Sequence, residues 1–286
     1  MSQNQLPSGI GLTAISIATE RRIETERPDR MFRDDLAGAF CAAAMKASGP
    51  AGITGFTGLS LGDFVPMLRG YMALRTRLFD DLLLDACAAG CRQVVILAAG
   101  LDARAFRLAW PEGVRLFELD VPEVLAFKRG VLDEAAATPS CERHEVAVDL
   151  REDWPSALKA QRFDASAPTV WLVEGLLLYL TEEDNNRIFE AISALSAPGS
   201  RLGFEHGSPT MLNSPAIARS REETLGKVGV TWLSAVADPV AWLARHGWSA
   251  EHLDAATLST TYGRAVPPVL DPAQGEARLW ILGGKR

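Results

Sequence analysis

The sequence predicts an α/β fold with a mostly parallel, doubly wound sheet. The short apolar run at 93–98 comes after Gly90 and is typical of a buried central strand. Further strand-like runs alternate with helix-like segments up to residue 206, which is the pattern of a parallel sheet covered by helices. Acidic residues follow the second, third and fourth runs, at Asp120, Asp149 and Glu174. Folds of this class bind ligands at the carboxyl ends of their strands.

Length and charge limit what the chain can be. Its 286 residues allow one such domain with a large appendage, or two small domains. Hydrophobic residues make up 48% of the chain, which is enough for a sizeable core. The net charge of −7 argues against a nucleic-acid partner and against an anionic membrane surface, because both require a basic face.

The first 90 residues are expected to form a helical cap. Helices are expected at 13–26, 36–46 and 66–89, with a glycine-rich loop at 48–62. Pro28 ends the first helical stretch, because proline cannot continue the hydrogen-bond ladder of a helix.

Residues 91–286 are expected to form the core that contains the sheet. Strands are expected at 93–98, 114–119, 144–148, 169–173, 201–205, 248–253 and 277–282. Helices are expected at 102–110, 121–137 and 181–196. Another helix begins at Asp238-Pro239, with the aspartate as N-cap and the proline at the first helical position. The stretch 207–230 carries prolines, serines and charges, and is expected to be an insertion after the fifth strand.

The cysteines and the apolar segments give no further signal. None of Cys41, Cys87, Cys91 and Cys141 forms a Cys-x-x-Cys pair, so neither a zinc site nor a disulfide framework is expected, and no metal is predicted. No apolar run approaches the length of a membrane span, and the first nine residues lack a signal-like apolar core. A cytoplasmic protein is therefore expected.

The turn after the run at 93–98 is the sharpest feature. Small residues occupy it, Gly100 lets a ligand approach the backbone, and Asp120 follows twenty residues later, where a carboxylate can accept hydrogen bonds from a ribose diol. Ala98 and Ala103 interrupt the Gly-x-Gly-x-x-Gly pattern that a pyrophosphate requires. The turn suits an uncharged adenosine joined to an amino acid better than a dinucleotide. On this turn alone, an ordinary strand-turn-helix junction with a surface aspartate stays open.

The next two strand ends extend this pattern. Asp149 can accept from an adenine amino group, and the backbone N–H of Leu150 can donate to a ring nitrogen. Glu174 follows a fully apolar run, and a charge there is costly unless it is paired, so we expect it to line the cleft.

These residues resemble a known family. The segments 97–104, 118–120, 148–150 and 174–180 are similar to the leucine carboxyl methyltransferase family, and more closely to its bacterial branch of S-adenosylmethionine-dependent enzymes that includes polyketide carboxyl O-methyltransferases. Segments 30–37, 69–81 and 238–248 also resemble family segments, so the resemblance spans nearly the whole chain.

The resemblance implies a class I S-adenosylmethionine-dependent methyltransferase. This is a Rossmann-like, mostly parallel seven-stranded sheet with an N-terminal helical cap and a lid insertion at about 207–235. It also implies the cofactor contacts. Arg75 or its neighbour Arg77 would pair with the methionine carboxylate, Gly100 would admit the cofactor, and Glu174 would lie near the methionine ammonium. The family usually has glycine where Ala98 stands. The full set implied to bind the cofactor is Arg75, Arg77, Ala98, Gly100, Asp120, Val121, Asp149, Leu150, Glu174 and Gly175.

The expected activity is methyl transfer to oxygen, with a carboxylate of a small molecule or peptide-like natural product as acceptor. A carboxylate is ionised at pH 7 and needs no general base, whereas a phenol usually does. His206 is the histidine best placed to be a base. The acceptor candidates are Met211, Trp232, Tyr262 and Arg264, of which Arg264 could bind an anion.

Three alternatives stay open at this point. They are a hydroxyl or phenol O-methyltransferase of secondary metabolism, an NAD-dependent oxidoreductase and a non-catalytic protein that binds S-adenosylmethionine. The missing phosphate-loop glycines count against the oxidoreductase. The sequence leaves the oligomeric state open.

Overall fold

The structure is a computed structural model that describes residues 6–7, 9–48, 68–224, 226, 229–252, 255–271, 273 and 279–286. Most of the expected glycine-rich loop at 48–62 lies outside these ranges.

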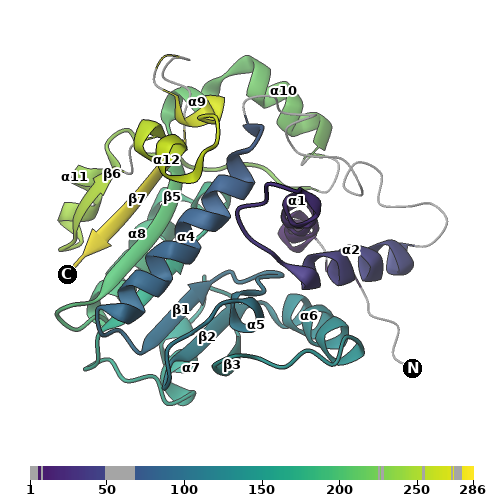
Figure 1. The fold of residues 1–286 in the computed structure, drawn as a ribbon. Coiled ribbons are helices and arrows are strands. Elements are labelled where there is room, and N and C mark those ends of the chain that lie inside the picture. The colour runs from purple at the N-terminus through teal and green to yellow at the C-terminus, as the bar shows by residue number, and fades with distance from the viewer. Residues whose placement is uncertain are drawn as a thin grey trace.

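A seven-stranded sheet forms the centre of the fold (Figure 1), with the strand order β3-β2-β1-β4-β5-β7-β6. The strands β1 to β5 pair in parallel, whereas β7 runs antiparallel to both β5 and β6. This arrangement confirms the predicted mostly parallel, doubly wound sheet. The strands are β1 (Gln93–Leu97), β2 (Arg115–Asp120), β3 (Glu142–Ala147), β4 (Thr169–Val173), β5 (Arg201–Gly207), β6 (Ser249–His252) and β7 (Leu279–Lys285).

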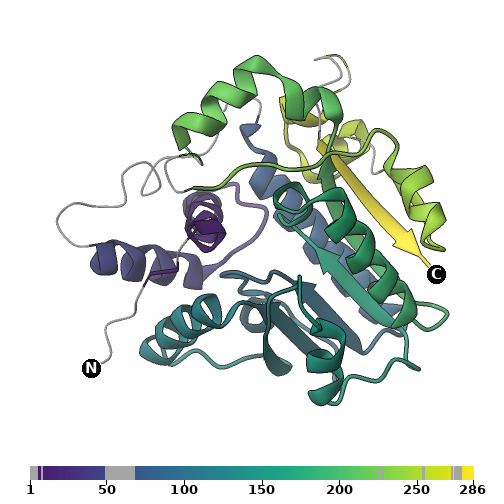
Figure 2. The same cartoon turned by 180° about the vertical axis from the view of Figure 1, so that it is seen from behind.

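Helices cover both faces of the sheet. Every residue of β1 and β4 is buried, which explains why both strands are apolar after their first residues, Gln93 and Thr169. Helix α4 covers one face, and α8 covers the other (Figures 1 and 2). The helices are α1 (Thr13–Glu26), α2 (Asp35–Ser48), α4 (Tyr71–Ala88), α5 (Arg104–Arg107), α6 (Pro122–Glu134), α7 (Trp154–Ala160), α8 (Glu182–Ala194), α9 (Pro209–Asn213), α10 (Pro215–Thr224), α11 (Pro239–Arg245) and α12 (Ala255–Tyr262).

The helix limits follow local chemistry. Helix α1 has the limits expected from the sequence. Helix α4 begins at Tyr71, because Gly70 before it is left-handed with φ +75°. Thr181 caps α8 by accepting from the backbone N–H of Asp184, and Asp238 caps α11 in the same way.

The helix predictions were wrong in one place and incomplete in others. The helix expected at 102–110 is only one turn long in α5, because Leu108 adopts an extended conformation after it. The sequence patterns did not indicate α7, α9, α10 or α12. Helix α7 begins at Trp154, after Asp153, whose side chain caps it by accepting from the backbone N–H of Ser156 at 3.2 Å, so its signal is a cap and not a long apolar period.

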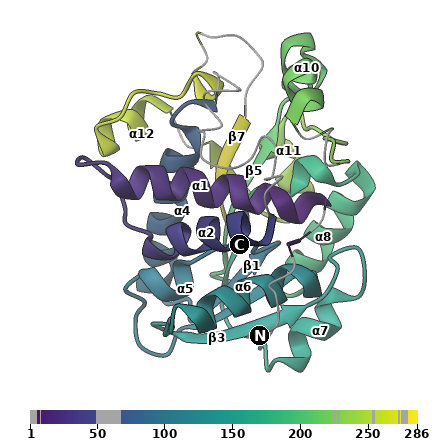
Figure 3. The same ribbon diagram turned by 90° about the vertical axis from the view of Figure 1, so that its right-hand side faces the viewer.

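Helices α1 and α2 pack against each other, and α1 crosses over the sheet layer in Figure 3. Helix α4, in contrast, packs directly against β4 and β5. The expected boundary between cap and core near residue 90 stays a prediction, because α4 precedes that boundary and yet contacts the sheet.

The segment expected to be a lid, at about 207–235, contains α9 and α10. Residues 230–237 follow without regular secondary structure, and we call them the strap. The backbone N–H of Leu233 in this strap donates to the carbonyl of Leu178 at 2.7 Å, and that of Val236 donates to the carbonyl of Gly207 at 2.9 Å. Among the described helices, none combines the length and apolarity that crossing a membrane would require.

Candidate functional site

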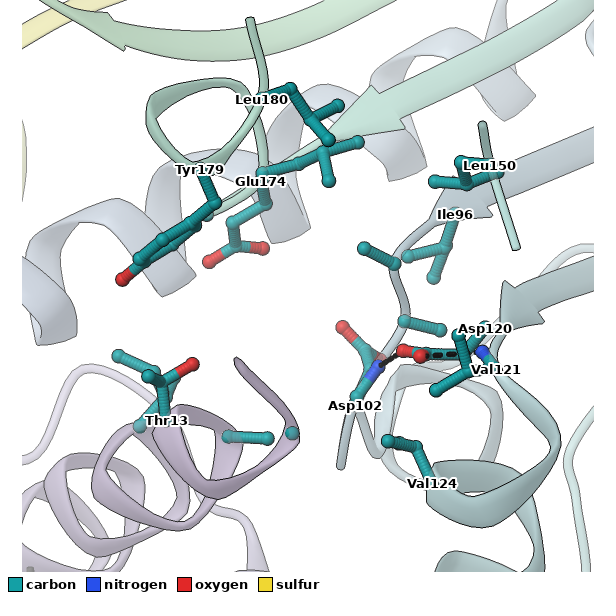
Figure 4. A pocket seen from close by; sticks show the side chains of 18 of the residues that line it. Thr13, Ile96, Asp102, Asp120, Val121, Val124, Leu150, Glu174, Tyr179 and Leu180 are labelled. Carbon is teal, nitrogen blue, oxygen red and sulfur yellow. Dashed lines mark hydrogen bonds between the residues drawn. The ribbon is translucent and has the colours of Figure 1, made fainter. Parts of the chain in front are cut away.

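A cavity of about 470 Å³ lies at the carboxyl ends of β1, β2 and β4, under helix α1. Figure 4 shows Glu174 and Tyr179 entering it from one side, Thr13 from α1, and Asp120, Val121 and Leu150 from the opposite side. This is the position at which doubly wound folds bind their ligands.

The turn after β1 is tight and needs small residues. Ala98 and Gly100 are both left-handed, with φ of 51° and 50°. A Cβ atom added to Gly100 would lie 3.1 Å from the Cβ of Ala14 on α1, so the cap comes close to this turn. Alanine is strained at such a φ, which gives a physical reason why relatives would favour glycine at the position of Ala98.

Asp120 at the end of β2 is held by backbone donors. Its Oδ2 accepts from the N–H of Gly100 at 2.6 Å, and its Oδ1 accepts from the N–H of Val121 at 2.7 Å (Figure 4). Burial raises the pKa of Asp120, and these two N–H groups oppose that rise. Each carboxylate oxygen retains a lone pair, so the group can still accept from two neighbouring hydroxyls.

Asp149 and Leu150 line the cavity after β3. The Oδ1 of Asp149 accepts from the backbone N–H of Arg151 at 2.9 Å, and the carboxylate also pairs with the Arg151 guanidinium. These hydrogen bonds lower the pKa of Asp149. This wall of the cavity thus presents the partly exposed carboxylate of Asp149, a hydrogen-bond acceptor, beside the apolar side chain of Leu150.

Arg75, Glu174 and Gly175 meet at the opposite end of the cavity. The Arg75 Nε lies 2.8 Å from Glu174 Oε1, and its Nη1 donates to Glu205. Burial lowers the pKa of Arg75, but Glu205 and Glu174 raise it by more, so the guanidinium stays charged. The N–H of Gly175, a residue with φ 67°, donates to Glu205 Oε1 at 2.8 Å.

Arg104 and Glu205 belong to this cluster, although sequence reasoning gave neither of them a role. Arg104 is 2% exposed, and its Nη1 lies 2.8 Å from Glu174 Oε2 while its Nε lies 2.7 Å from Asp80 Oδ1. It also pairs with Asp102. For Glu205 the sequence did contain a signal, because a charged residue near the end of a buried strand such as β5 requires a partner.

Arg75 and Arg77 are two residues apart on α4, so their side chains leave the helix in different directions. Arg75 lines the cavity, whereas Arg77 does not. The Arg77 Nε pairs with Asp81 at 3.0 Å, its Nη1 donates to the carbonyl of Met31 at 2.8 Å, and its guanidinium carbon lies 5.7 Å from the centre of the Tyr262 ring. Between the two arginines, the geometry therefore favours Arg75 as a ligand for the cofactor.

His206 faces a different cavity, of about 290 Å³, beside Trp242 of α11. Successive residues of a strand point to opposite faces, so Glu205 faces α4 and His206 faces α8 and α11. The Nδ1 of His206 accepts from the N–H of Gly207 at 2.9 Å, and burial lowers its pKa to about 4. Its position gives it no access to the 470 Å³ cavity, whose described lining does not include it.

The four acceptor candidates also lie elsewhere. None of Met211, Trp232, Tyr262 and Arg264 is among the described residues that line the 470 Å³ cavity. Met211 is buried in the core, and the Tyr262 hydroxyl donates to Asp81 at 2.9 Å. Arg264 has its charge taken up by Glu24 and Asp29.

Other residues line the cavity beyond the cofactor candidates, and sequence reasoning missed them. Those from α1, from the turn after β4 and from the strap include Thr13, Ile17, Tyr179 and Leu233. Tyr179 connects α1 with the strap, because its hydroxyl interacts with Thr13 and with Trp232.

Known proteins resemble this chain in sequence. The model of the family described as leucine carboxyl methyltransferase matches residues 14–193. A protein from Parafrankia sp. (strain EAN1pec), whose name places it among S-adenosyl-L-methionine-dependent methyltransferases, is 46% identical over 262 residues, which is 91% of this chain and 83% of the relative.

Solved structures share the fold. A methyltransferase structure from Thermobifida fusca superposes with a TM-score of 0.51 at 21% identity, covering 89% of each chain. Magnesium protoporphyrin IX methyltransferase from Synechocystis, with bound S-adenosylhomocysteine, gives a TM-score of 0.52 at 13% identity and covers 80% of this chain and 90% of its own. At these identities the likeness concerns the fold alone, which is that of class I methyltransferases.

Proposed function

Because the chain belongs to the leucine carboxyl methyltransferase family, and is an S-adenosylmethionine-dependent methyltransferase, we propose that it methylates a carboxylate and forms a methyl ester. The acceptor would be a small molecule or natural product. The cofactor supplies a methyl group that its sulfonium has already activated. The protein needs only to hold donor and acceptor in line and to exclude water.

The lining of the cavity supports a site for the cofactor along its whole length. Asp120 would accept from the ribose hydroxyls, and its two backbone hydrogen bonds hold it in place for that role. Asp149 and the N–H of Leu150 would bind the adenine. The tight turn at Gly100 allows close approach, and Val121 adds apolar surface to the same wall.

The opposite end suits an amino acid, which carries one charge of each sign. Arg75 would bind the methionine carboxylate, and Glu174 would lie near the ammonium group beside Gly175. Figure 4 shows the Glu174 carboxylate directed into the cavity.

The observation that supports a carboxylate acceptor is the lack of a suitable general base at the amino-acid end of the cavity, among the residues that the structure describes. No histidine is among the described residues of its lining. Glu174 and Asp102 are both paired with Arg104, which also keeps their pKa values below the usual range despite burial. A phenol would need a proton acceptor, whereas a carboxylate is already ionised.

The chemical test is the stability of the product. Purified protein is incubated with S-adenosylmethionine carrying a labelled methyl group and a set of acceptors that contain a carboxylate, a phenol or an alcohol. A methyl ester releases labelled methanol in mild alkali, whereas an ether retains its label. A product that survives alkali would replace this proposal with a hydroxyl O-methyltransferase, and binding without transfer to any acceptor class would favour a non-catalytic role.

A second readout is the dependence of rate on pH. With an ionised carboxylate acceptor and no base to titrate, the rate should stay flat from about pH 6 to 8. Replacing His206 by alanine should leave cofactor binding and this profile unchanged, because the side chain faces the other cavity. A rate that collapses in that variant while the cofactor still binds would contradict the proposal.

A further inference from the structure

Glu205 lies behind the amino-acid end of the cavity and is not part of its described lining. It is only 4% exposed, near the end of β5. A buried carboxylate is costly unless its partners offset the loss of hydration. Its partners therefore indicate what the charge does.

Glu205 joins two of the residues that line the cavity. Its Oε1 accepts from the Arg75 Nη1 and, at 2.8 Å, from the N–H of Gly175. Its Oε2 accepts from the hydroxyl of Tyr71 on α4. One carboxylate thus fixes a helix side chain and the turn after β4 relative to each other.

These contacts define the direction of the Arg75 guanidinium. Its Nε lies 2.8 Å from Glu174 Oε1, and its central carbon lies 5.7 Å from the centre of the Tyr71 ring. Glu205 holds Nη1, and Glu174 lies against the buried Nε without a hydrogen bond of good geometry. Within the described part of the chain, the edge of the guanidinium that carries Nη2 is the one that these contacts leave for a ligand.

The same carboxylate also holds Gly175. This residue has φ 67°, a conformation that side chains disfavour. A Cβ atom added there would lie 3.9 Å from both Arg75 Nη1 and Glu205 Oε1. The peptide and the guanidinium therefore stand next to each other, with Glu205 as their common acceptor.

We propose that Glu205 is a positioning residue that orients the Arg75 guanidinium and the Gly175 peptide toward the amino-acid end of S-adenosylmethionine. An arginine side chain loses much rotamer freedom when it is ordered, and Glu205 imposes that order before the cofactor binds. The inference rests on the proposed assignment of that end of the cavity to Arg75 and Glu174.

The test compares two ligands that differ only at the amino-acid end. S-adenosylhomocysteine carries the amino acid on its sulfur, whereas methylthioadenosine carries only a methyl group there. Calorimetry measures both affinities in the wild type and in Glu205→Gln, which keeps the size and an acceptor but loses the charge. We expect S-adenosylhomocysteine to bind about tenfold more weakly, because a charged hydrogen bond is lost, and methylthioadenosine to bind as before.

Two further variants separate positioning from a general structural effect. Glu118→Gln removes another buried glutamate, which pairs with Lys128 and Arg143 on a different part of the sheet, and should leave the ratio of the two affinities unchanged. Glu205→Asp keeps the charge and should retain more of the preference for S-adenosylhomocysteine than Glu205→Gln. Equal weakening of both ligands in Glu205→Gln, or no change in either, would overturn the inference.

Arg75→Gln tests the premise separately. It should remove the preference for S-adenosylhomocysteine over methylthioadenosine. If it does so and Glu205→Gln does not, only the inference about Glu205 fails. If Arg75→Gln keeps the preference, the assignment of the amino-acid end fails, and the inference about Glu205 fails with it. None of these binding measurements depends on the acceptor, which the methanol-release assay tests independently.

Discussion

The adenosine end and the amino-acid end of the cavity are built differently. At the adenosine end, Gly100, Asp120 and Asp149 each lie at the end of their own strand. Asp120 accepts from two backbone N–H groups, and Asp149 accepts from the backbone and the side chain of Arg151. At the amino-acid end, side chains from α4, α5, β5 and the turn after β4 form a buried ion cluster. The first end depends on the geometry of strand ends, whereas the second depends on tertiary packing.

This difference has an energetic consequence. Removing one member of a buried ion cluster leaves its partners charged, buried and unpaired, which costs far more than losing an exposed pair. Changes at the amino-acid end should therefore affect folding as well as binding. Changes at the adenosine end should mainly affect binding.

Arg104→Leu should have the largest effect. It removes a cation that is 2% exposed from Asp80, Asp102 and Glu174. Asp80 keeps its pair with Arg107 and Glu174 keeps its pair with Arg75, but Asp102 loses the arginine with which it pairs, so we expect a loss of about 3–5 kcal/mol in the free energy of unfolding. Urea denaturation measures it. The matched control is Arg129→Leu, whose exposed pair with Glu145 should contribute less than about 1 kcal/mol. Equal losses in the two variants would remove the distinction between the ends.

Asp120→Asn should weaken cofactor binding and cost less stability than Arg104→Leu, although its amide NH2 would face one of the two backbone N–H groups that now donate to the carboxylate. Losing a charged acceptor for the ribose hydroxyls costs about 1.5–3 kcal/mol, so the affinity should fall at least about tenfold. Because the ribose is common to S-adenosylhomocysteine and methylthioadenosine, both should weaken equally, in contrast to Glu205→Gln. Asp238→Asn is the control, because asparagine caps α11 as well as aspartate does. Selective weakening of one ligand by Asp120→Asn would place Asp120 elsewhere in the site.

His206 provides a comparison outside both ends. Its pKa falls from 6.5 to about 4 on folding, so the native state holds it neutral. The associated stability is fully present above pH 6.5 and is lost as the pH falls toward 4, and it should decrease by about 2 kcal/mol between pH 7 and 5.

The measurement is urea denaturation of the wild type and His206→Gln at both pH values. The variant should lose less stability on acidification than the wild type. Its affinity for S-adenosylhomocysteine should stay unchanged, because the ring faces the smaller cavity. Parallel acid curves for the two proteins would contradict the lowered pKa.

Ala98→Gly should have the smallest effect and the opposite sign. Ala98 has φ 51°, and glycine relieves that strain at some entropic cost, so a gain of about 0.5–1 kcal/mol is expected. The control is Ala99→Gly, because Ala99 is not among the residues with positive φ and should lose stability instead. Thermal unfolding of both variants measures these changes in stability. A lower stability of Ala98→Gly than of the wild type would show that the turn is not strained.

Residues near a strand end were the ones that sequence reasoning located well. Asp120, Asp149, Leu150 and Glu174 all line the cavity, because the end of a predicted parallel strand fixes where the next residue lies. Arg104 lies in the segment 97–104 that resembles the family, but the sequence does not indicate its role. Two of its carboxylate partners, Asp80 and Glu174, are far from it in the chain, and nothing marks the nearby Asp102 as a partner. Arg75 and Arg77 could be distinguished only by the direction in which each leaves α4.

The acceptor side was the least predictable part. Arg264 carries a charge that could bind an anion, but Glu24 and Asp29, more than 200 residues earlier, take up that charge. Tyr179 and Leu233 approach the cavity from segments that are unrelated in sequence. No local sequence pattern predicts such contacts, because they depend on how the strap and α1 pack over the sheet.

By itself, the sequence determined the strand alternation, the small-residue turn at Gly100 and the acids that follow the strands, because these depend on periodicity and on backbone geometry near each residue. Only the tertiary structure decided which charges became partners. Burial makes an unpaired charge costly, so the pairing of Glu205 with Arg75, and the turning of His206 to the other face, follow from packing and strand direction that the linear order does not contain.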